Sequence, residues 1–224
     1  MLVITCEHAS ALIPRSLKPL FQRAEDIVAS HRGLDRGALS YARALSVHLG
    51  CPLYAGQVSR LVIDLNRSLH HRKLFSEFTQ ILSSQEKRKL IERYWIPFRQ
   101  EVHAVLLKNK RVYHLSCHTF TPVFHGVERQ CDIGILYDPS RKEEKAFAEK
   151  LSTCLKRETS LRVRMNYPYH GRADGHTTGL RREFPGGEYS GIELEVNQAL
   201  IGGDYWKYVA LPVLYRSMRT IVKV

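Results

Sequence analysis

Apolar residues recur at helical spacing in several stretches of the chain. One such stretch predicts a helix whose buried face is formed by Ala38, Tyr41, Ala42, Leu45 and Leu49. Gly50 suits the left-handed position that follows the last turn of this helix. Asp35 stands near its beginning, where an aspartate is a favoured N-cap residue.

Two further helices are indicated by capping-box spacing. Ser83 with Glu86, and Ser140 with Glu143, place a hydroxyl three residues before a carboxylate, ahead of apolar residues at helical spacing. Pro97 falls within the first of these helices, and we expect it to kink or split that helix because proline lacks the backbone N–H.

Short runs rich in β-forming residues predict the strands of a sheet. Because they alternate with the predicted helices, they indicate βαβ units and a sheet covered on both faces. In such sheets ligands collect beyond the carboxyl ends of the strands, so polar residues at those ends are candidates for function. The predicted strands are residues 2–6, 52–56, 60–64, 112–117, 132–137, 161–165 and 191–196.

The composition is that of an ordinary globular protein. The chain has 224 residues, of which 44% are hydrophobic and 25% charged, without linker or repeat, so we expect one domain over residues 1–224. No export signal and no apolar run of about 20 residues is visible, which favours a cytoplasmic protein. The five cysteines form no C-x-x-C motif and are interpreted as reduced thiols.

The net charge of +12 would attract polyanions or small acidic substrates, and by itself it does not choose between them. A nucleic-acid-binding protein is one alternative. It is disfavoured because the chain has no RNP-like aromatic motif, no zinc-finger spacing and no concentrated basic stripe.

Histidines near the ends of two predicted strands suggest a metal site. His8 and His118 follow the strands at 2–6 and 112–117, and imidazole is a strong ligand for zinc. A catalytic zinc needs about three protein ligands, and Asp35 is the third candidate. Glu7 is the substitute ligand if Asp35 only caps its helix. Most of the other histidines, a group that includes His70, His71, His103, His125 and His176, are interpreted as solvated.

The run SRLVIDLNRS, residues 59–68, ends in an asparagine and an arginine that together suit an anion. Arg67 offers a planar fork that matches a carboxylate, and Asn66 adds a neutral donor beside it. The alternative is structural: Asp64 would pair with an arginine, and Asn66 would begin a turn.

Two carboxylates share one face of the last predicted strand. Glu193 and Glu195 alternate in GIELEV, and a carboxylate near a metal can act as general base, for which Glu193 is preferred. Pairing of both with basic residues is the alternative. The stretch 166–184 is long and rich in glycine and aromatic residues, as in a covering loop. Arg181 or Arg182 in this stretch could hold a second substrate carboxylate or form a surface salt bridge.

Seven segments spread over most of the chain together resemble the N-formylglutamate amidohydrolase family. They are TCEHASALIP (5–14), GLDRGA (33–38), VSRLVIDLNRS (58–68), SCHTFTPVFHG (116–126), DIGILYD (132–138), NYPYHGRADGHT (166–177) and IELEVNQ (192–198). The resemblance implies the fold of zinc-dependent exopeptidases, an α/β domain of three layers with a mostly parallel mixed sheet. It also implies a divalent metal, expected to be zinc, and hydrolysis of N-formyl-L-glutamate to formate and glutamate.

Carried over to this chain, the resemblance assigns a role to each candidate. His8 and His118 match the metal histidines, Asp35 the acidic position after the first loop, and Glu193 the catalytic glutamate. Asn66 and Arg67 resemble the pair with which zinc carboxypeptidases hold a substrate carboxylate. The H-x-x-E spacing of carboxypeptidases is missing, since Ala11 stands three residues after His8.

Amide hydrolysis also needs a group that stabilises the tetrahedral oxyanion, for which Arg60 is the candidate. The expected partner is therefore a small N-acyl acidic amino acid, without a membrane. An amidase or carboxypeptidase of the same fold that acts on another acylated amino acid or peptide is the nearest alternative, because a carboxylate clamp serves all of these substrates. The oligomeric state is left open.

Overall fold

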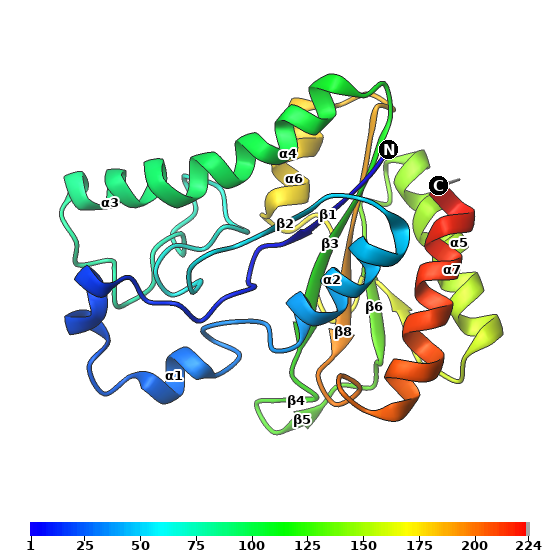
Figure 1. The fold of residues 1–224 in the computed structure, drawn as a ribbon, viewed down its shortest axis with the longest axis horizontal. Coiled ribbons are helices and arrows are strands. Elements are labelled where there is room, and N and C mark those ends of the chain that lie inside the picture. Colours follow the sequence, from blue (N-terminus) through cyan, green and yellow to red (C-terminus); the bar gives the residue numbers. More distant parts are fainter. Residues whose placement is uncertain (223–224) are drawn as a thin grey trace.

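A six-stranded sheet runs through the centre of the molecule, with the strand order β2-β1-β3-β8-β6-β7 (Figure 1). The computed structural model describes residues 1–222. Strands β2, β1, β3 and β8 are parallel, β6 is antiparallel to β8, and β7 is parallel to β6. The predicted α/β class with a mostly parallel mixed sheet is therefore confirmed. The strands of this sheet are β1 (Leu2–Cys6), β2 (Leu53–Ala55), β3 (Val112–Phe120), β6 (Ile133–Leu136), β7 (Val163–Met165) and β8 (Tyr189–Asn197).

Helices cover both faces of this sheet and give three layers (Figure 1). Helices α2, α5 and α7 pack on one face, and α4 and α6 pack on the other. A small hairpin of β4 (Val123–Phe124) and β5 (Val127–Glu128) projects from one end of the molecule. The helices are α1 (Glu25–Ala29), α2 (Ala38–Leu49), α3 (Ser84–Leu90), α4 (Ile96–Lys108), α5 (Lys142–Glu158), α6 (His176–Glu183) and α7 (Leu211–Val222), with a 3-10 helix at Arg15–Phe21 and π-helical segments at Ile91–Trp95 and Trp206–Ala210. Within residues 1–222, no helix has the length and apolar character that crossing a membrane would require.

Alternation along the central strands sends apolar side chains to one face and polar side chains to the other. The apolar residues pack with α2, α5 and α7 in the largest core cluster; from the strands they include Ile4, Cys6, Leu115, Cys117, Ile192 and Leu194. The opposite face buries Thr5, Glu7, His114, Ser116, His118, Glu193 and Glu195. The main core and the candidate chemistry therefore lie on opposite sides of the same strands.

The helix predicted from the spacing of Ala38 to Leu49 is confirmed, and its predicted apolar face is buried. Asp35 is not its N-cap. Gly37 holds that position with φ of 82°, and a β-carbon there would meet the side chain of Ile201 at 2.4 Å, so both conformation and space favour glycine. Because Asp35 does not cap the helix, its carboxylate is available for another role.

Of the two predicted capping boxes, only one forms. Ser83 and Glu86 cap α3 reciprocally, as expected. The prediction for Ser140 and Glu143 is wrong, because α5 begins at Lys142 without a side-chain cap. Ser140 instead donates its backbone N–H and its hydroxyl to Asp138 Oδ1, which forms a local turn ahead of the helix.

Pro97 lies in the first turn of α4, and the predicted long helix changes its winding just before it without a break in the chain's helical run. The five residues before α4, Ile91–Trp95, form a π-helical segment between α3 and α4. A wider turn at this point accommodates a proline that cannot donate a backbone hydrogen bond.

The strand predicted at 60–64 is wrong. These residues form turns, with Val62 N bonded to Ser59 O and Asp64 N bonded to Leu74 O. The apolar run is nevertheless buried, because its side chains pack in a second core cluster together with Phe98 and other residues around α3 and α4. Burial, and not strand formation, accounts for its hydrophobicity.

The stretch 166–184 is only partly irregular. Helix α6 forms its second half, so the interpretation of the whole stretch as a loop is wrong. His176, the first residue of α6, is fully buried, which corrects its interpretation as a solvated histidine. The five cysteines are free thiols, as predicted.

Candidate functional site: two histidines and a carboxylate

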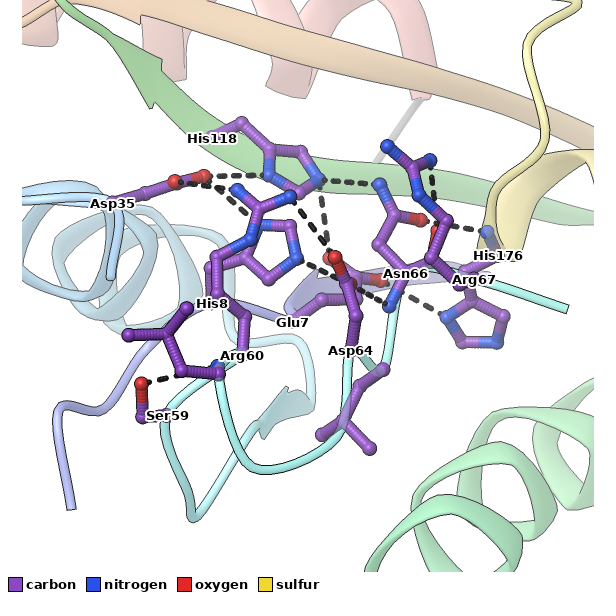
Figure 2. Close-up of polar contacts among 12 residues, drawn as sticks. Glu7, His8, Asp35, Ser59, Arg60, Asp64, Asn66, Arg67, His118 and His176 are labelled. Atoms are coloured by element: carbon purple, nitrogen blue, oxygen red, sulfur yellow. Dashed lines mark hydrogen bonds and ion pairs between the residues drawn. The ribbon is translucent and has the colours of Figure 1, made fainter. Parts of the chain in front are cut away.

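His8, Asp35 and His118 converge at one point on the polar side of the sheet (Figure 2). His8 lies just beyond β1, Asp35 lies in the loop before α2, and His118 lies inside β3 and not after it, because that strand extends to Phe120. The Nδ1 atoms of His8 and His118 lie 3.2 and 2.8 Å from the same atom, Asp35 Oδ2. All three side chains are buried. The structure thus brings together the predicted metal ligands.

The ring nitrogens that face away from this point are held by other polar groups. His8 Nε2 lies 2.7 Å from Asp64 Oδ1, and His118 Nε2 lies 2.9 Å from Ser116 Oγ. In metal sites a ligating histidine usually donates its second ring N–H in this way, which leaves the first nitrogen free to bind. One carboxylate and two Nδ1 atoms form a donor set that suits zinc. The observation that supports a cation here is that both Nδ1 atoms point at the same carboxylate oxygen, Asp35 Oδ2.

The charges in the site support each other. Burial alone would raise the pKa of Asp35, but His8 and His118 outweigh burial and lower it. Burial would lower the pKa of His118, but its contacts with Asp35 and Glu7 raise it well above the ordinary value. The carboxylates of Asp35 and Glu7 thus favour positive charge at this cluster, as a site for a cation requires.

Glu7 does not occupy the position expected of a substitute ligand. Its carboxylate lies 3.3 Å from Nε2 of His118, on the side of the ring opposite Asp35. It is fully buried and does not line the cavity beside the cluster. The geometry therefore favours Asp35 as the third member of the cluster.

A cavity of about 130 Å³ opens beside the three residues. It brings together most of the residues proposed from the sequence. Its walls include His8, Asp35, Arg60, Asn66, Arg67, His118, Thr119, Leu136, Tyr169, His170, Ala173, Asp174, Glu193 and Glu195. The irregular part of the 166–184 stretch thus contributes to the wall, as a covering segment would.

Arg67 and Asn66 reach this cavity from the turn that replaces the predicted strand. The Nη1 atom of Arg67 donates to the carbonyl of Asp174 at 2.5 Å, while its Nε atom is buried without a partner. The side-chain oxygen of Asn66 accepts from the backbone N–H of His176 at 2.7 Å. The carbonyl of Arg67 in turn accepts from Trp95 and Arg99, so the turn is held from behind.

Arg60 lies between two carboxylates of the cluster. Its guanidinium is 3.0 Å from Asp64 Oδ2 and 3.5 Å from Asp35 Oδ1. The predicted structural pairing of Asp64 with an arginine is thus observed, and Asp64 also holds His8. The guanidinium still lines the cavity.

Glu193 and Glu195 both reach the cavity, as their alternation predicts, but their surroundings differ. Glu193 Oε1 accepts a hydrogen bond from Thr177 Oγ1 at 2.6 Å. Glu195 Oε2 is buried and has no hydrogen-bond partner. Burial raises the pKa of Glu195 to about 7. One carboxylate is thus oriented by a hydroxyl, and the other is held in a poorly solvated position.

Arg181 lies outside the cavity. Its guanidinium is buried against Glu144 and donates to the carbonyls of Gly171 and Gly191. With its donors engaged in these contacts, it supports the 166–175 segment and is not placed to hold a substrate. Arg182 is exposed on the surface of α6.

Sequence reasoning missed several residues of the site. Tyr169, His170 and Asp174 line the cavity, and Thr177 orients Glu193. All lie in the stretch 166–184, whose composition gave the only signal. Their individual roles depend on how that stretch folds back over the sheet, and no local pattern encodes this path.

The chain is similar to one known family and to several solved structures. A model of the family described as N-formylglutamate amidohydrolase matches residues 1–202. The crystal structure of gene product Atu2144 from Agrobacterium tumefaciens is similar with a TM-score of 0.85 and 27% identity, over 99% of this chain and 90% of that one. The N-formylglutamate amidohydrolase of Ralstonia eutropha JMP134 is similar with a TM-score of 0.68 and 16% identity, over 98% and 90% of the two chains, and this likeness concerns the fold. No curated protein sequence is significantly similar to the chain.

Proposed function

Because the chain belongs to the N-formylglutamate amidohydrolase family, we propose that it is a metal-dependent amidohydrolase of N-formyl-L-glutamate or a similar N-acyl acidic amino acid. Water would add to the acyl carbon, the C–N bond would break, and the products would be formate and glutamate. The observation that carries this proposal is the convergence of two Nδ1 atoms on one carboxylate oxygen beside a cavity.

A divalent cation, expected to be zinc, would be held by His8, Asp35 and His118. In such sites the cation polarises the amide carbonyl and lowers the pKa of water. The two histidines suit this role because Asp64 and Ser116 occupy their other ring nitrogens.

The cavity residues would bind and orient the substrate. Arg67 offers a fork of donors for a carboxylate, and Asn66 lies beside it. Hydrogen bonds from Trp95 and Arg99 to the carbonyl of Arg67 hold this turn in place. A clamp fixed in this way would position an acidic amino acid with its acyl group toward the histidines.

Glu193 would move the proton. A general base takes a proton from the attacking water and returns it to the leaving nitrogen, and Thr177 holds the Glu193 carboxylate toward the cavity. Arg60, fixed by Asp35 and Asp64, is placed on the cavity wall to stabilise negative charge on the acyl oxygen. A donor in that role lowers the activation free energy by about 3 kcal/mol.

The test is to purify the protein, measure its metal content, and assay formate release before and after chelation. We expect about one divalent ion per chain and formate release that stops on chelation and returns with zinc. N-acetyl, N-succinyl and N-formylaspartyl analogues define the substrate. A clear preference for one of these over N-formylglutamate would reassign the substrate. Full activity in metal-free protein would refute the metal dependence.

A further inference from the structure

Glu7 is a buried carboxylate that lies between His118 and His176 (Figure 2) and has four hydrogen-bonding neighbours. Its Oε1 atom accepts from Thr5 Oγ1 at 2.7 Å and contacts His176 Nδ1 at 2.9 Å. Its Oε2 atom accepts from Ser116 Oγ at 2.7 Å and lies 3.3 Å from His118 Nε2. An ionised carboxylate has acceptors only, so every neighbour in this network must direct a proton toward it.

This requirement fixes the proton on His118. The single hydroxyl proton of Ser116 is directed at Glu7, so Ser116 Oγ can only accept from the ring nitrogen that lies 2.9 Å away, His118 Nε2. The Asn66 amide nitrogen, which can only donate, lies farther from the same nitrogen, at 3.5 Å, so the shorter contact decides and His118 carries a proton on Nε2. Its other nitrogen, Nδ1, is the one that faces Asp35 and the proposed cation.

The same reasoning extends to two more histidines. Thr5 also gives its proton to Glu7, so it accepts from His114 Nε2 at 2.8 Å, and His114 Nδ1 accepts from the hydroxyl of Tyr189 at 2.8 Å. His176 donates through Nδ1, which leaves a lone pair on its buried, unpartnered Nε2. One anion thereby determines which nitrogen carries the proton in three imidazoles.

Glu7 also connects the histidine cluster to helix α6. His176 begins that helix, and its backbone N–H donates to Asn66 in the cavity wall. The next residue, Thr177, orients Glu193. The carboxylate thus joins the strand that carries His118 to the helix that orients the proposed general base.

We infer that Glu7 is a positioning residue: its carboxylate keeps the proton of His118 on Nε2, so that Nδ1 is presented to the cation, and it anchors the start of α6. This inference rests on the proposed metal site. Its function differs from that of a ligand, because Glu7 acts on the far side of the imidazole.

The first test is Glu7→Gln, with zinc affinity measured by competition against a chromogenic chelator. A glutamine places an NH₂ donor among groups that all donate, so one contact must break. We expect zinc affinity to fall by about 10–100-fold, the usual effect of removing a partner of a ligating histidine. Glu144→Gln is the matched control, since Glu144 is also a fully buried carboxylate but pairs with Arg181. The zinc affinity of Glu144→Gln should stay within about twofold of the wild-type affinity, because within residues 1–222 Glu144 has no contact with a ligating histidine.

Ser116→Ala covers the case in which Glu7→Gln does not fold. This variant keeps Glu7 but removes the hydroxyl between it and His118, and we expect about a 10-fold loss of zinc affinity. Unchanged affinity in a folded Glu7→Gln protein, or in Ser116→Ala if only that variant folds, would overturn the inference.

A second readout is independent of metal. Nitrogen-15 NMR of the wild-type imidazoles should show His176 protonated on Nδ1 and His114 protonated on Nε2. The opposite protonation of either ring would overturn the inference. If wild-type protein binds no zinc, the proposed function fails. The protonation of His176 and His114 still shows in that case whether Glu7 organises the network.

Discussion

The two faces of the central sheet are built from the same strands but bury opposite kinds of side chain. One face packs Ile4, Leu115 and Leu194 against α2, α5 and α7. The other buries carboxylates, hydroxyls and imidazoles beneath α4, α6 and the 166–175 segment. Removing apolar area from water stabilises the fold, whereas burying polar groups costs free energy unless they are hydrogen-bonded.

The apolar face therefore accounts for most of the stability of the fold, and the polar face carries the candidate site. On the polar face almost every group has a partner, and the exceptions among the described residues include Glu195 Oε2 in the cavity wall. A face of this kind contributes little net stability but holds side chains in one arrangement. Substitutions on the two faces should therefore have different consequences.

The largest effect is expected for His118→Ala on the polar face. We predict that bound metal and formate release are lost together, because one of the three proposed ligands is removed. Metal analysis and the formate assay on the same sample check this. His125→Ala is the control, since His125 is exposed, and it should keep both properties. Full metal occupancy in His118→Ala would remove His118 from the ligand set.

Glu193→Gln should lower kcat by about 10²–10⁴-fold, the range for loss of a general base. The fold should persist, because glutamine can still accept from Thr177. Glu195→Gln, on the same strand and in the same cavity, is the matched variant, and we expect it to lose less. Steady-state kinetics decide between the two, and a larger loss in Glu195→Gln would transfer the role of base to Glu195.

Leu194→Ala tests the apolar face between these two carboxylates. Its side chain is fully buried, so we expect the free energy of unfolding to fall by about 2–5 kcal/mol. Urea unfolding measures this change. Zinc affinity of the folded fraction should be close to wild type, and a large loss would mean that the two faces are not independent.

Arg67→Ala should raise KM by about 10–150-fold, which corresponds to the loss of a charge-assisted hydrogen-bonded contact of about 1.5–3 kcal/mol. Arg67→Lys keeps the charge but not the planar fork, and it should recover only part of the binding. Unchanged KM and kcat in Arg67→Ala would contradict its role as a carboxylate clamp.

The smallest effect is expected away from both faces. Ser83→Ala removes the capping box of α3 and should lower the free energy of unfolding by about 1 kcal/mol, without a change in kcat. Ser84→Ala, one residue later, should change stability by less than about 0.5 kcal/mol. Equal effects of the two substitutions in urea unfolding would show that the capping box contributes nothing.

Local pattern was sufficient for much of the fold. The strands at 2–6 and 191–196 follow from their runs of β-forming residues, and the helix at 38–49 follows from helical spacing, which directly reflects which face is buried. The run at 60–64 misled, since an apolar stretch that packs in a core cluster looks the same whether it is a strand or a series of turns.

The proximity of His8 and His118 was predictable, because each lies near the carboxyl end of a predicted strand, where the polar residues of parallel strands gather. The network of Glu7 was not. His114 reaches this network from β3, which pairs with β1, whereas His176 reaches it from the start of α6, which packs on β8. Similarly, Arg181 looked like a substrate contact, but its buried partner Glu144 could be recognised only from the tertiary structure.

The π-helical turn before Pro97 contains one residue more than regular helical winding would use. Deleting a residue from Ile91–Trp95 would let the two flanking helices join as one uninterrupted α-helix and would rotate α3 by about 100° about its axis. Leu90 would then leave the second core cluster, to which Val62 and Leu65 also belong, and the turn that ends in Asn66 and Arg67 would lose support. The length of this short segment thus determines which face of α3 points toward the core cluster that supports the wall of the cavity.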